Sequence, residues 1–209
     1  MLKHHVRLAA AAAALAWICA GCGAVRPTKY YTLDVAATPA APSTSPNAVS
    51  ILVSHVTSSH LYRDDRIVYG SGQVQLGVYD DHRWAETPVN MIQDALISSL
   101  RATGQYRSVS RVGSSARGEY ILRSQLISLY EADRPNLLAR FSMHIELFDP
   151  KAGATIWTDS YSHDEPVSSK TVAAVVEAMD KNVHAGMQQF TTGLAQYFAS
   201  HPPQTEAAH

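Results

Sequence analysis

Hydrophobic and polar residues alternate along several segments of the chain, which is the pattern expected of half-buried β-strands. The clearest alternation covers residues 137–148, where Leu137, Phe141 and Leu147 are three of six apolar residues spaced two apart. The turn-forming segment 149–153 (DPKAG) follows and predicts a hairpin to a strand at 155–163. Other strands are predicted at 29–33, 49–56, 66–69, 73–79, 107–111 and 120–130, with a turn at 70–72 (GSG).

Two segments instead repeat apolar residues at three- and four-residue steps, which predicts helices. The first has Thr87 as its N-cap, Pro88 as its first residue and Gly104 at its end. The second covers about 169–199 and presents one apolar stripe. The order of elements predicts a single α+β domain: a mostly antiparallel or mixed β-sheet with two helices, one of them long and C-terminal, packed on one face.

The first 21 residues have the organisation of a lipoprotein signal peptide. Lys3 and Arg7 precede an uncharged run at 8–18, and small residues lie before Cys22. This pattern predicts cleavage before Cys22 and acylation of that cysteine, with a plain membrane anchor as the alternative. We therefore divide the chain into a signal peptide (1–21), an acylated N-terminus with a short strand and a Pro/Ala/Ser-rich loop (22–48), an α+β domain (49–200) and a disordered tail (201–209).

Composition and charge restrict the class of protein. The 209 residues are 46% hydrophobic and carry a net charge of −1, which excludes disorder as the main state and nucleic-acid binding through bulk positive charge. The two cysteines, Cys19 and Cys22, both lie near the N-terminus. No disulfide can therefore connect distant parts of the domain, and its stability must come from its core.

The sequence contains no catalytic signature. Eight histidines follow Cys22 without the close spacing of metal ligands. Asp64-Asp65 and Asp80-Asp81 are interleaved with arginines, which indicates ion-paired loop ends rather than an acid–base pair. We expect no metal and no cofactor, apart from the diacylglycerol and N-acyl chain (such as palmitate) carried covalently by Cys22.

Two segments resemble the signature of the ABC-type transport auxiliary lipoproteins, the family of the PqiC (YmbA) proteins. These are 61–69 (LYRDDRIVY) and 79–86 (YDDHRWAE). Cys22 and the segment 30–33 (YYTL) match the start of the same family. In one departure from the family pattern, Arg63-Asp64 reverses the usual Asp-Arg pair, and Asp65 replaces the following proline.

The resemblance implies a lipoprotein that faces the periplasm and accompanies an MCE-domain protein and an ABC transporter in lipid transport between two membranes. Gly23 is consistent with the outer membrane, because it is not the aspartate associated with inner-membrane retention. The candidate partner-binding residues are Arg66, Arg83, Trp84 and Glu86. Each also has a structural interpretation: ion pairing with aspartates for the arginines, packing beneath the helix for Trp84, and a favourable position at the helix N-terminus for Glu86.

Two other functions stay open beside this non-enzymatic accessory role, namely a periplasmic lipid carrier and an envelope enzyme. A carrier needs a pocket of about 300 Å³ or more between the long helix and the sheet. The residues expected there are large and favour a filled core: Phe141, Met143, Phe190 and Leu194. Self-association into a homo-oligomer is also left open.

Overall fold

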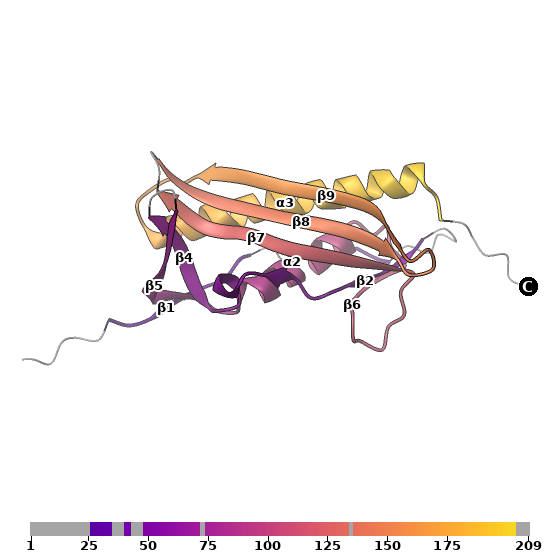
Figure 1. Cartoon of the computed structure of the whole chain (residues 1–209), viewed down its shortest axis with the longest axis horizontal. Coiled ribbons are helices and arrows are strands. Elements are labelled where there is room, and N and C mark those ends of the chain that lie inside the picture. The colour runs from indigo at the N-terminus through magenta and orange to yellow at the C-terminus, as the bar shows by residue number, and fades with distance from the viewer. Residues whose placement is uncertain (1–25, 35–39, 43–47, 72–73, 134–135, 204–209) are drawn as a thin grey trace, which may run out of the picture.

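The computed structural model describes residues 26–34, 40–42, 48–71, 74–133 and 136–203. Within these ranges the chain forms a nine-stranded mixed sheet, two α-helices and one 3-10 helix (Figure 1). The signal peptide, Cys22 and residues 204–209 of the predicted tail lie outside them. The elements are β1 (Lys29–Tyr31), β2 (Ser50–Val53), β3 (Thr57–Ser58), η1 (His60–Tyr62), β4 (Arg66–Ser71), β5 (Gln75–Trp84), α2 (Pro88–Ala102), β6 (Ser108–Arg111), β7 (Tyr120–Asp133), β8 (Leu137–Asp149), β9 (Ala154–Pro166) and α3 (Val172–Ser200).

Strand β7 organises the sheet. Along one edge it pairs antiparallel with β8, which pairs in turn with β9. Along its other edge β7 pairs in parallel with β2, β3 and β4, one after another. The predicted mixed sheet is therefore confirmed, with long antiparallel ladders and short parallel ones.

The predicted turn at 149–153 is confirmed. The Asp149 side chain accepts hydrogen bonds from the backbone N–H groups of Lys151 and Ala152, at 2.8 and 3.2 Å. Gly153 has φ of 66°, a conformation that favours glycine. These contacts close the hairpin between β8 and β9.

The turn predicted at 70–72 is displaced along the chain. Strand β4 continues to Ser71, which pairs with Gln75, so Gly70 and Ser71 belong to the strand, and residue 72 of the predicted turn lies outside the described residues. Strand β5 begins at Gln75 and extends to Trp84, well beyond the predicted end at residue 79. The extension follows from pairing on both sides, because β1 and the start of β4 each contact the end of β5.

Both helices begin and end close to their predicted positions. Thr87 is the N-cap of α2 through its backbone carbonyl, with no hydrogen bond from its side chain, and Gly104 follows the helix with φ of 63°. Helix α3 begins at Val172, three residues after the expected position. Its N-cap is Thr171, whose hydroxyl accepts the N–H of Ala174 at 3.2 Å.

The helices lie on one face of the sheet, and the core fills the space between them (Figure 1). Phe141, Met143, Phe190 and Leu194 are all at most 1% exposed. Asn182 of α3 is also completely buried, and its amide donates to the carbonyls of Ala139 and His163 at 2.9 Å each. The region between α3 and the sheet is therefore packed with side chains, as the sequence predicted.

Candidate interaction site

The three sequence segments that resemble the lipoprotein family meet in the structure. Strand β1 pairs in parallel with the end of β5, so that Tyr31 lies beside Trp84. The carbonyl of Tyr31 accepts the N–H of Ala85 at 2.7 Å, and the carbonyl of Asp65 accepts the N–H of Trp84 at 2.6 Å. Backbone hydrogen bonds therefore fix the segments 30–33, 61–69 and 79–86 to one another. We call this region the signature region.

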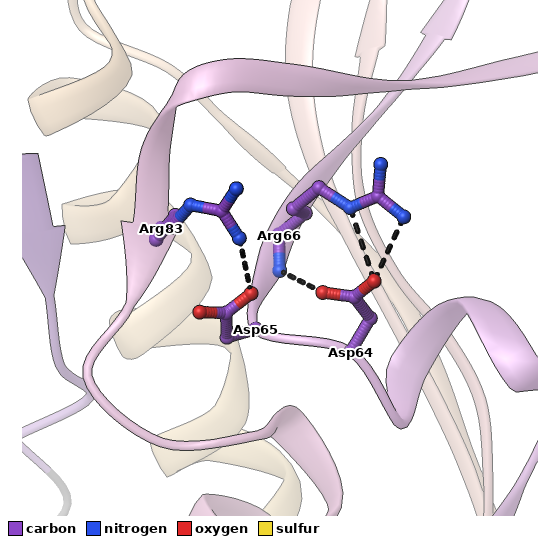
Figure 2. A network of polar contacts seen from close by, with 4 residues as sticks. All are labelled: Asp64, Asp65, Arg66 and Arg83. Carbon is purple, nitrogen blue, oxygen red and sulfur yellow. Dashed lines mark hydrogen bonds and ion pairs between the residues drawn. The ribbon is translucent and has the colours of Figure 1, made fainter. Parts of the chain in front are cut away.

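Two arginine–aspartate pairs lie side by side on the surface of the signature region (Figure 2). Arg66 donates through Nε and Nη2 to Asp64 Oδ2, at 3.0 and 2.8 Å. Arg83 donates through Nη1 to Asp65 Oδ1 at 2.6 Å. Because Arg66 and Arg83 are register partners on β4 and β5, the sheet holds the two pairs next to each other.

Each pair joins one positive and one negative side chain, so the four charges cancel. The hydrogen bonds from Arg66 lower the pKa of Asp64 to about 2, so this carboxylate is charged at neutral pH. All four side chains are between 32% and 41% exposed, and exposed ion pairs contribute little to the stability of a fold. The pairs therefore define a fixed, partly exposed pattern of charge rather than a major source of stability.

Trp84 lies in the core rather than on this surface. Its side chain is 1% exposed and belongs to the same buried cluster as Met91 and Ile92 of α2. This agrees with the packing interpretation, and it removes Trp84 from the residues that a partner could touch without rearrangement of the domain. An indole of this size contributes a large apolar surface to the core at the end of β5.

Glu86 belongs to a groove whose lining residues do not include Arg66 or Arg83. It is exposed and lines an open groove of about 280 Å³. The groove also contains Thr32 and Leu33 from the first motif segment, together with Met91, Asp94, Ala95 and Ser98 of α2. The structure therefore brings Arg66 and Arg83 together, buries Trp84 and directs Glu86 to a neighbouring groove.

Two further hydrogen bonds stabilise the signature region, and neither was predicted from the sequence. The hydroxyl of Tyr79 donates to Glu131 of β7 at 2.6 Å, and burial together with this carboxylate raises the pKa of Tyr79. The Tyr31 hydroxyl lies 3.0 Å from Nδ1 of His82. Three of these residues, Tyr31, Tyr79 and His82, stand in the motif segments. No sequence pattern predicted the pairing of β4 with β7, which brings Glu131 close to Tyr79.

A second polar cluster lies on the sheet face opposite the helices. His144 Nδ1 is 2.8 Å from the Ser160 hydroxyl, and His144 Nε2 is 3.4 Å from Glu146. This is the order of nucleophile, base and acid in serine hydrolases. However, the N–H of Ser160 is used by Asp159 at 2.7 Å, so it is not directed at a substrate carbonyl. We interpret the cluster as a cross-strand polar ladder, since His144 and Ser160 are register partners.

The described part of the chain contains no group of three or more histidine, cysteine, aspartate or glutamate side chains placed to hold a metal ion. Neither of its two α-helices is long and apolar enough to cross a membrane.

Comparison with known proteins identifies the family. Residues 31–190 match the model of the ABC-type transport auxiliary lipoprotein component, so the chain belongs to that family. No curated protein matches. Among solved structures, protein XCC0632 from Xanthomonas campestris is similar, with a TM-score of 0.72, 17% identity and coverage of 84% of this chain and 98% of that chain. An uncharacterized protein is also similar, with a TM-score of 0.61, 11% identity and coverage of 81% and 99%. At these identities the two structures show a shared fold.

Proposed function

We propose that this protein is a non-enzymatic accessory lipoprotein of an ABC/MCE-type system that moves lipids between two membranes. In this proposal Cys22 carries the acyl chains, the domain faces the periplasm from the outer membrane, and an MCE-domain protein is its partner. Membership of the family supports an association with a transport system. The lipid system, the membrane and the partner are our proposal.

The surface that we assign to the partner is formed by Arg66 and Arg83. The observation that carries this assignment is the pair of adjacent arginine–aspartate bridges in the region where the family resemblance concentrates. Each bridge fixes its guanidinium, while roughly a third or more of each arginine side chain stays exposed. Fixed charges at the rim of an interface orient a partner and raise its association rate.

An adaptor fits the packing of the domain better than a carrier does. A carrier must enclose an acyl chain, but the large side chains between α3 and the sheet are buried against one another. A carrier would have to separate α3 from β8 to make room, which would expose Phe141 and Phe190. This cost favours a function carried out on the surface.

The anchoring part of the proposal is tested at Cys22. Cys22→Ala should abolish incorporation of labelled fatty acid and leave the unprocessed precursor, while Cys19→Ala should still be acylated. Fractionation of the wild-type envelope should then place the labelled protein in the outer membrane. Labelling of the Cys22→Ala variant equal to that of the wild type would contradict the proposal.

The partner surface is tested by charge reversal. The variant with both Arg66→Glu and Arg83→Glu should capture less of a co-expressed MCE-domain protein, with the loss greatest at low ionic strength. Its melting temperature should stay close to that of the wild type, because exposed ion pairs contribute little to stability.

The matched control is Arg140→Glu. Arg140 forms a comparable pair with Asp164 on β8 and β9, with distances of 2.6 Å and similar exposure, but it lies outside the signature region. This variant should capture the partner normally. Equal capture by a folded double-arginine variant would move the interface away from the signature region, first to the sheet face that carries Arg140.

A further inference from the structure

We infer that the segment 26–30 lies against the lipid surface and that the end of the domain carrying β1 faces the membrane. The inference rests on the acylation of Cys22 in the proposed function, but not on the partner surface. We propose that the surface in contact with this exposed segment is a phospholipid bilayer.

The tether between Cys22 and the segment 26–30 is short. Only four residue steps separate Cys22 from Arg26, and an extended chain spans at most about 3.6 Å per residue, so Arg26 lies within about 14 Å of the acylated residue. The acyl chains of Cys22 are buried in the bilayer. The segment that begins at Arg26 is therefore confined to the neighbourhood of the lipid headgroups.

The side chains of the segment 26–30 suit a lipid surface. Arg26, Lys29 and Tyr30 are exposed, and Tyr30 has 65% of its surface accessible. Within the described ranges, neither Arg26 nor Lys29 has a carboxylate at ion-pair distance. Two unpaired cations complement anionic phospholipid, and tyrosine favours the boundary between headgroups and acyl chains, where its ring is buried and its hydroxyl hydrated.

The residues that follow this segment are attached to the rest of the domain by hydrogen bonds. The Tyr31 hydroxyl lies 3.0 Å from His82 of β5, and the backbone N–H of Asp34 donates to Asp180 of α3 at 2.7 Å. Contact of residues 26–30 with lipid therefore fixes the orientation of the whole domain. Figure 1 shows β1, β4 and β5 at one end of the long axis and β6 at the other, so β6 would point away from the membrane.

The experiment measures the depth of two engineered tryptophans in the acylated mature protein, which begins at Cys22 and is produced from the full-length chain. Tyr30→Trp is the test variant, and Val112→Trp, just after β6, is the control because Val112 is also exposed, at 40%. Each protein is reconstituted into vesicles of phosphatidylethanolamine and phosphatidylglycerol, with and without brominated acyl chains. The parent protein supplies the background emission of Trp84 and Trp157.

Brominated lipid should quench the added emission of the Tyr30→Trp variant and leave that of the Val112→Trp variant unchanged. Equal quenching of both, or quenching of Val112→Trp alone, would overturn the inferred orientation. Flotation and the mass of the mature chain are measured first, so a failure of acylation is seen separately from a wrong orientation. Absence of acylation would also overturn the inference, whereas loss of partner capture would not.

The role of the cations is tested in the Tyr30→Trp background. Arg26→Glu combined with Lys29→Glu should reduce the quenching in vesicles that contain phosphatidylglycerol, and 1 M salt should reduce the difference between this variant and its parent. The single variant Lys29→Glu is then compared with the control Arg117→Glu, because each changes the net charge by the same amount and Arg117 is an exposed arginine in the connection between β6 and β7. An equal effect of both changes would show that only the net charge of the protein matters, which would contradict a local contact at residues 26–30.

Discussion

Gly186 of α3 lies directly against Phe141 of β8, because a Cβ atom at residue 186 would come within 2.7 Å of Phe141 Cε1. The same atom would lie 3.0 Å from Cδ1 of Tyr161 on β9. The absence of a side chain at this one position lets the long helix approach two aromatic rings of the sheet. The filled core that argues against a lipid carrier depends on this close approach.

Gly186→Ala should therefore destabilise the domain, although alanine favours helix by about 1 kcal/mol over glycine. Overpacking of a close-packed core costs about 1–3 kcal/mol, and Phe141 is completely buried and has no room to move. Urea unfolding measures the difference. Gly193→Ala is the control: its Cβ would meet the half-buried Trp157 at 3.2 Å, so it should be neutral or stabilising. Equal losses in both variants would contradict the explanation.

Asn182 should be among the most sensitive polar residues of the domain. It donates to two backbone carbonyls, Ala139 O and His163 O, and its Oδ1 accepts the Tyr161 hydroxyl at 2.8 Å. Asn182→Ala leaves these groups without their partner in the core, and an unsatisfied buried polar group costs about 1–3 kcal/mol. We expect a loss of about 2–4 kcal/mol in the free energy of unfolding.

The control for this prediction is another amide on the same helix. Gln189 donates to Asp159 and to the Ser160 carbonyl, but it is exposed, so water can replace it in Gln189→Ala. That variant should lose less than about 1 kcal/mol. A similar loss in both variants would mean that burial does not set the energetic importance of Asn182.

The Asp64 carboxyl should titrate with a midpoint near 2 when followed by carbon NMR. Its pKa in the folded state is below the ordinary value of 3.8, so the pair stabilises the fold above that value and loses its contribution as pH falls from about 4 to about 2. The effect on stability is small, because both side chains are exposed. Arg66→Gln should return the Asp64 midpoint towards 3.8.

Arg140→Gln serves as the control for the titration. The hydrogen bond from Arg140 lowers the pKa of Asp164, so this variant should raise the midpoint of Asp164 and leave that of Asp64 unchanged. A midpoint of Asp64 that does not respond to the loss of Arg66 would refute the pairing shown in Figure 2.

Local sequence patterns were sufficient for the elements whose information is itself local. Alternation in 137–148 predicted β8, the residues of 149–153 predicted its turn, and Thr87, Pro88 and Gly104 marked the limits of α2. The parallel pairings were not predictable in this way. Strands β2 and β3 are four and two residues long, and they reach β7 from about 70 residues away along the chain. No turn or spacing encodes such a contact.

The candidate site likewise has some features that local sequence predicted and others that depend on the whole fold. The motif segments are the reason for placing the candidate site here, and the interleaved charges predicted the arginine–aspartate pairs. The sequence did not show that β1 joins β5, because a three-residue parallel ladder depends on the position of the whole sheet edge. The burial of Trp84 is a property of the assembled core rather than of the motif.

Trp84→Ala should act on the fold and not primarily on the partner. The side chain is 1% exposed, and truncation of a buried aromatic residue to alanine costs about 3–5 kcal/mol through lost burial and the cavity that remains. Trp84→Phe, which keeps an apolar ring, should lose clearly less, and its folded form should capture the MCE-domain partner as well as the wild type does. Melting curves and capture are therefore measured on the same preparations, below the melting temperature of each variant. A Trp84→Ala variant with an unchanged melting temperature and no capture would place the indole in the interface and refute its assignment to the core.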